Sequence, residues 1–132
     1  MSQITTKKVG EGPNHLVLHV FMQSDGAELD NYVLLAPSDL NPVLPAKPAL
    51  RIMRMWYGFS WFDVTLKFGG IVPRPVWTLP RDINCFDFNH FGGIKDVTTS
   101  PPSDQDGKIL ISTNDFAPAG SQGSLVIEFR KP

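Results

Sequence analysis

Glycine and proline divide this chain into short apolar segments, and this division restricts the fold more than any other feature of the sequence. The chain contains 12 prolines and 11 glycines, most of which lie between apolar runs. Proline cannot donate a ladder hydrogen bond, and glycine readily adopts turn conformations. No window has the apolar spacing and length of a long helix. The sequence therefore predicts an all-β protein made of short strands and turns.

Several strands can be predicted individually. We expect His15–Met22 to be covered on both faces, because it is almost continuously apolar, and to form a hairpin with Leu29–Ala36. Leu50–Tyr57 and Trp61–Phe68 are predicted to form a second hairpin, and the latter alternates apolar and polar residues with a period of two. Pro37–Pro48 is predicted to be an extended connection. Further strands are predicted at Val76–Leu79, Ile83–Phe88, Lys108–Thr113 and Ser124–Lys131.

Length and connectivity indicate one domain. A chain of 132 residues can bury one core without needing cross-links. Long connections between short strands favour an all-β jelly-roll or Greek-key β-sandwich of about eight short antiparallel strands. We therefore predict a single β-sandwich domain over residues 1–132. Residues 1–12 are expected to be available as an N-terminal arm that could pair with the sheet edge of a neighbour.

Charge and cysteine content restrict the partners and the compartment. The net charge is -1, from 12 Lys+Arg and 13 Asp+Glu, whereas proteins that bind nucleic acid usually carry a basic excess. The single cysteine, Cys85, excludes an intrachain disulfide. Residues 1–9 are polar and mixed and lack the apolar run expected of a signal peptide, and no apolar run approaches about 20 residues. We expect no nucleic-acid or membrane partner, and a cytoplasm-like compartment or a particle assembled there.

Candidate metal ligands and nucleophiles are sparse. His15 and His19 share one face of a strand but are separated by about 13 Å, too far for one zinc ion. His90 follows a strand and is expected to make local hydrogen bonds. Cys85 is interpreted as a buried structural thiol rather than a nucleophile. We predict no catalytic residue, no metal and no cofactor.

Carboxylates and tryptophans leave two other function classes open. Asp63, Asp82 and Asp87 lie near aromatic residues and could serve a glycoside hydrolase, which needs two facing carboxylates. The three tryptophans, Trp56, Trp61 and Trp77, could form a sugar-stacking platform, although we favour a role in the core or in a subunit interface.

Five blocks of the sequence, in this order and at these spacings, resemble small virion structural proteins of podovirus-like tailed bacteriophages. They are Arg51–Tyr57, Val64–Phe68, Phe86–Ile94, Gly107–Thr113 and Gly123–Lys131. The resemblance implies a jelly-roll decoration, or cement, protein on the outside of an icosahedral head. Such a protein bridges neighbouring subunits of the major capsid protein, commonly as a dimer or trimer, and carries no catalytic residues.

Interface residues can be predicted because arginine and tryptophan commonly dominate binding energy. We predict Trp56, Trp77, Arg54 and Arg74 as protein contacts. The resulting hypothesis is a non-enzymatic capsid decoration protein of the virion surface, a homo-oligomer that is assembled in the host cytoplasm. The alternative hypothesis is a carbohydrate-binding module of a phage tail or receptor-binding apparatus.

Overall fold

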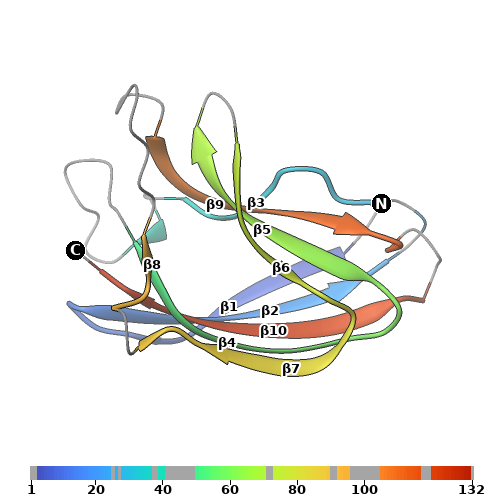
Figure 1. Ribbon diagram of the computed structural model, residues 1–132, viewed down its shortest axis with the longest axis horizontal. Coiled ribbons are helices and arrows are strands. Elements are labelled where there is room, and N and C mark those ends of the chain that lie inside the picture. The colour runs from blue at the N-terminus through green and yellow to red at the C-terminus, as the bar shows by residue number, and fades with distance from the viewer. Residues whose placement is uncertain are drawn as a thin grey trace.

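The computed structural model consists of two antiparallel β-sheets packed face to face, which confirms the expected all-β sandwich (Figure 1). It describes residues 3–24, 26, 28–36, 39–40, 50–70, 73–89, 92–95, 105–116 and 120–131, without the side chains of residues 3, 70, 82, 105 and 106. The six-stranded sheet has the order β1-β2-β10-β4-β7, and β8 also pairs with β4. Its strands are β1 (Gln3–Glu11), β2 (His15–Gln23), β10 (Gln122–Arg130), β4 (Arg51–Phe59), β7 (Asp82–Asp87) and β8 (Ile94–Lys95). The four-stranded sheet has the order β3-β9-β5-β6. Its strands are β3 (Tyr32–Leu35), β9 (Gln105–Asn114), β5 (Asp63–Gly70) and β6 (Arg74–Leu79).

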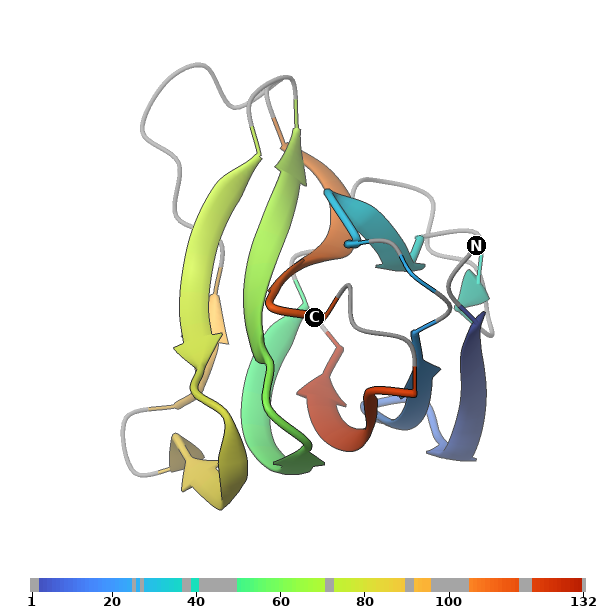
Figure 2. The same ribbon diagram turned by 90° about the vertical axis from the view of Figure 1, so that its right-hand side faces the viewer.

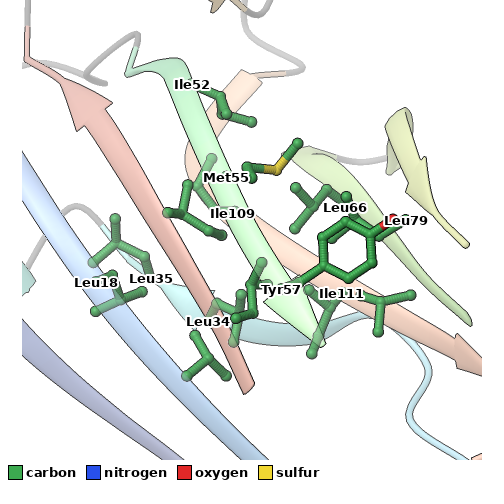
Figure 3. Close-up of a cluster of buried hydrophobic side chains, with 14 of the residues drawn as sticks. Leu18, Leu34, Leu35, Ile52, Met55, Tyr57, Leu66, Leu79, Ile109 and Ile111 are labelled. Carbon is green, nitrogen blue, oxygen red and sulfur yellow. The ribbon is translucent and has the colours of Figure 1, made fainter. Parts of the chain in front are cut away.

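The core lies between the two sheets and is built by alternation along each central strand. In β5, Val64, Leu66 and Phe68 are buried, while the residues between them are half-buried. Burying an aliphatic or phenylalanine side chain contributes about 1.5–3 kcal/mol. Figure 3 shows side chains of both sheets meeting in this layer, among them Leu18, Ile52, Met55, Leu66, Ile109 and Ile111.

Both predicted hairpins are wrong. β2 and β3 lie in opposite sheets, and so do β4 and β5, so each of these connections crosses from one sheet to the other (Figure 2). Alternation identifies a strand and its buried face, but it does not identify the pairing partner. β2 is also covered on one face only, because its residues alternate between buried and more exposed positions.

The N-terminal residues were expected to be available as an arm, but Gln3–Glu11 forms β1 within the chain's own sheet. β1 pairs antiparallel with β2 from Gln3 opposite Gln23 to Glu11 opposite Leu16. Residues 1–2 lie outside the described residues, as do His90 and most of the predicted connection Pro37–Pro48.

The edge strands are interrupted. Three of them carry one extra residue that breaks the ladder: Val9 in β1, Leu34 in β3 and Val76 in β6. β6 also contains Pro75, which has no N–H to offer a further strand. On β7 the side chain of Asn84 accepts the backbone N–H of Cys85 at 2.8 Å. Each of these devices discourages pairing with another sheet edge.

Arg81 joins three connections that cross between the sheets. It follows β6, and its guanidinium contacts Asp63 at the start of β5 at 3.2 Å and Asp115 after β9 at 2.6 Å. Hydrogen bonds from Arg81 lower the pKa of Asp63 below its usual value. The contact with both carboxylates raises the pKa of Arg81 still further above neutrality. The three crossings are thereby fixed at one end of the sandwich.

Candidate binding face

The candidate site is the outer face, defined here as the side of the six-stranded sheet that is turned away from the four-stranded sheet (the lower side in Figure 1). Residues that pair directly across antiparallel strands share a face. The register therefore sorts the outward side chains of β2, β10, β4 and β7 into rows that run across the strands.

Two neighbouring rows of the outer face are rich in apolar residues, and we call them the apolar rows. In the first, Val126 lies between His19 and Trp56, and Trp56 is opposite Cys85. The residues of the second row, from β2 to β7, are Phe21, Ser124, Gly58 and Ile83. Ile83 is 83% exposed, Trp56 is 40% exposed, and Phe21 is also exposed. An apolar face of this kind, on the outside of a sandwich, is typical of interaction surfaces.

A shallow hollow of about 490 Å³ lies in the apolar rows. Its lining includes Trp56, Val126 and Ile83, with Ser124 and Gly58 between them. The hollow exists because the two central positions of the second row have small side chains while larger apolar groups surround them. Its shape and chemistry suit an apolar side chain from a partner.

An ion pair lies beside the apolar rows. Arg54 donates two hydrogen bonds to Oε2 of Glu128, at 3.1 Å from Nε and 2.8 Å from Nη2. The same guanidinium lies 5.3 Å from the centre of the Trp56 ring. Arg54 thus orients the tryptophan by a cation–π contact while its own charge is balanced by Glu128.

The four predicted contact residues fall into two groups. Trp56 and Arg54 lie together on the outer face, in adjacent rows. Trp77 instead packs edge-on against Phe86 and Phe88, at 5.4 and 5.1 Å between ring centres, and covers the side of the core between β6 and β7. Arg74 is half-buried at the start of β6 and donates to the carbonyl of Gly69 at 3.1 Å. The structure does not bring the two groups together.

Cys85 was expected to be buried, and this is wrong. Phe86 and Phe88 point inward from the β7 segment, so Cys85 points outward to the outer face, where it is an exposed free thiol. Ile83, Val126 and Phe21, which also lie on the outer face, were not predicted as contact residues. All three alternate with inward-pointing residues of their strands, and this alternation would have assigned them to the outer face.

Of the candidate catalytic carboxylates, Asp63 and Asp87, the two whose side chains are described, do not converge. Asp63 is bound by Arg81, and Asp87 lies at the opposite end of β7, where it accepts the backbone N–H of Asn89 at 2.8 Å. The side chain of Asp82 is outside the description. Among the described residues there is no cluster of His, Cys, Asp and Glu that could hold a metal ion. Nor does the described part of the chain contain a helix of the length and apolarity needed to cross a membrane.

The three tryptophans do not share a surface. Trp56 lies on the outer face, and Trp77, 37% exposed, closes the side of the sandwich. Trp61 lies in the connection from β4 to β5 with a positive φ of 63° and is 79% exposed. A hollow of about 320 Å³ beside it is lined by Phe59, Ser60, Trp61 and Arg81. The three tryptophans therefore do not form a joint sugar-stacking platform, and Trp61 is the most exposed of them.

Comparisons with protein-family models, with curated proteins and with solved structures found no match.

Proposed function

We propose that this chain is a non-enzymatic capsid decoration, or cement, protein that binds the outside of a phage head through its outer face and bridges subunits of the major capsid protein. The main support is the exposed apolar surface around Trp56 and Ile83, with a hollow between them, on the outer face. The resemblance of five sequence blocks to virion proteins gives the class of partner.

The strand order supports a jelly roll in particular. The eight strands other than β1 and β8 form the two series β2-β10-β4-β7 and β3-β9-β5-β6. Among these eight, strands that follow one another in the chain alternate between the sheets, except β5 and β6, which pair within the four-stranded sheet. This is the order expected of two interleaved Greek keys, the arrangement found in many capsid proteins.

Docking would be driven by burial of the apolar rows, with Ile83 as the most accessible anchor. A standard interface buries about 800 Å² on each partner, and well-packed aromatic groups contribute most of its energy. A copy that contacts two capsid subunits gains further from multivalency, since its second contact is intramolecular. Association of the chain into a dimer or trimer, which we also propose, would multiply this effect and is measurable by analytical ultracentrifugation.

Co-sedimentation with undecorated phage heads tests the proposal. Ile83→Asp places a charge in the apolar rows and is expected to reduce binding by at least about tenfold, since desolvating an unpaired charge is costly. Trp61→Asp is the matched control, because Trp61 is equally exposed but lies outside the outer face. The proposal fails if the wild-type chain does not sediment with heads, or if both variants bind as well as it does.

Cys85 offers a second readout on the same surface. Its thiol is exposed beside Trp56 and should react with an alkylating reagent in the free protein. Binding of the chain to heads is expected to bury the thiol and so to slow this alkylation. Unchanged labelling of Cys85 in the sedimented complex would contradict docking by the outer face.

Carbohydrate binding is a second candidate function, favoured by Trp61. A non-glycine residue at positive φ is strained, and such strain often accompanies a functional role. An exposed indole beside Arg81 could stack on a sugar ring. A glycan array with the wild-type chain and Trp61→Ala tests this candidate, which is refuted if no glycan depends on Trp61.

A further inference from the structure

A row of basic side chains crosses the outer face at one end. Arg130 of β10 is opposite His15 of β2 and also opposite Arg51 of β4, and Arg51 is opposite Lys95 of β8. Neighbouring strands are about 4.8 Å apart, so this row of four residues is about 14 Å long. We call it the basic row.

The basic row has an unfavourable arrangement for a monomer in isolation. Like charges directly opposite each other destabilise a sheet. In the part of the chain that the structure describes, no carboxylate forms an ion pair with Arg51, Lys95 or Arg130, and the guanidinium of Arg51 donates to the carbonyl of Gly92 at 3.2 Å. Arg54, one row away, is by contrast balanced by Glu128. The net charge of the whole chain is only -1, so the basic row is a local concentration of charge.

We propose that the basic row binds a carboxylate-rich segment of a protein partner. This inference rests on the proposed function for the identity of that partner, because the row borders the surface proposed to dock. Arginine pairs with carboxylates through two parallel hydrogen bonds, so Arg51 and Arg130 would form the centre of the contact. Acidic groups of the partner would supply the missing counter-charges across the strands.

An acidic protein segment fits this surface better than nucleic acid does. The row next to the basic row contains Glu128, Arg54 and Asp87, and its formal charge is -1 because Arg54 balances Glu128, so it offers no further positive charge to a phosphate backbone that extended in that direction. Beyond them lie the apolar rows, which suit a protein surface. A protein partner would match these rows if its acidic groups faced the basic row and its apolar groups faced the apolar rows.

Binding of two labelled polyanions of equal length tests the basic row directly. The probes are fluorescein-labelled poly-L-glutamate and a single-stranded oligothymidine, measured by anisotropy over a salt series. The double variant Arg51→Gln/Arg130→Gln is expected to weaken poly-L-glutamate binding by about tenfold and to flatten its salt dependence. Lys7→Gln/Lys67→Gln removes the same charge at exposed Lys7 and half-buried Lys67, outside the basic row, and should change the affinity by less than about twofold.

Three results would overturn the proposal. The first is absence of poly-L-glutamate binding at low salt, and the second is equal weakening by both double variants, which would indicate bulk charge. The third is tighter binding of the oligonucleotide than of poly-L-glutamate, with dependence on Arg51 and Arg130, which would identify a nucleic-acid surface. Folding is checked by the thermal midpoint, which should be unchanged or higher in Arg51→Gln/Arg130→Gln because repulsion is relieved.

Binding assays with undecorated heads distinguish failure of this proposal from failure of the proposed function. Suppose that Ile83→Asp abolishes head binding, while Arg51→Gln/Arg130→Gln changes neither the rate of head binding nor the dependence of that binding on salt. Docking through the outer face then stands, and the role of the basic row is refuted. If heads bind no form of the chain but poly-L-glutamate binding follows the basic row, the decoration function fails and the acidic-partner inference stands.

Discussion

Gly123 is the position where one added methyl group should cost the most stability for a clear geometric reason. A Cβ placed there would lie 2.6 Å from Cδ1 of Phe59, 2.9 Å from Cζ of Phe62 and 3.0 Å from the carbonyl oxygen of Gly58. All three distances are below ordinary van der Waals contact, and one of them is to backbone that is held in the β4–β10 ladder.

The rings cannot easily move aside, because they form a continuous stack. Phe59 packs on Tyr57 at 4.8 Å and on Phe62 at 4.9 Å between ring centres, and Phe62 packs on Phe116 at 4.7 Å. Overpacking of a well-packed core costs about 1–3 kcal/mol. For 132 residues the unfolding entropy is about 0.28 kcal/mol/K, so Gly123→Ala should lower Tm by about 4–11 °C.

Differential scanning calorimetry measures this shift, with Gly10→Ala as the matched control. A Cβ on Gly10 meets nothing within 4 Å, so that variant should keep or slightly raise Tm. The penalty of Gly123→Ala should also fall by about 1 kcal/mol in a Phe59→Leu background, because the nearest contact is removed. A Tm for Gly123→Ala within 1 °C of the wild-type value would refute the claim that these rings have no room to move.

Three further predictions concern charge and the thiol. The side chain of Lys131 is only 1% exposed and donates a hydrogen bond to Glu11 at 2.7 Å. Lys131→Met should therefore lower the free energy of unfolding in urea by about 2 kcal/mol. A change below about 0.5 kcal/mol would contradict a structural role for the pair. Arg81 lowers the pKa of Asp63, so their contact contributes stability that is fully present above the unfolded pKa of about 4 and is lost as the pH falls through the folded pKa. Arg81→Gln should therefore be less stable than wild type at pH 7, and the difference should shrink below about pH 4; a difference that is constant with pH would refute this linkage. Cys85 should react with a thiol reagent in the native state at a rate close to that in the unfolded state, and strong native protection would contradict its exposure.

Local pattern predicted much of the sandwich. The alternation of Phe62, Val64, Leu66 and Phe68 identified both the strand and its buried face, and all four are buried. The second glycine of the pair Gly92–Gly93 also has a clear backbone role. Gly93 has a φ of 86°, and a Cβ there would lie 3.0 Å from the carbonyl oxygen of Ile52.

Strand pairing could not be predicted in the same way. Whether β4 pairs with β5 or with β10 depends on contacts between residues far apart in sequence, such as Met55 opposite Ile127, which no local pattern encodes. Trp56 and Arg54 were found because of their residue types. Ile83 was missed because an aliphatic residue is ordinarily expected in the core, although its alternation with Phe86 and Phe88 places it on the same face as Cys85. β1 was missed because Thr5 to Lys8 is polar and its strand geometry depends on the ladder with β2.

The interrupted edges affect how copies behave when they are crowded. Two molecules that meet side by side cannot continue one another's ladder without straightening a bulge such as that at Val9 or displacing Pro75. The edge strands therefore oppose lateral growth into a fibre, and contacts between copies are left to the faces of the sheets. In a dense lattice, such molecules would remain separate and able to exchange.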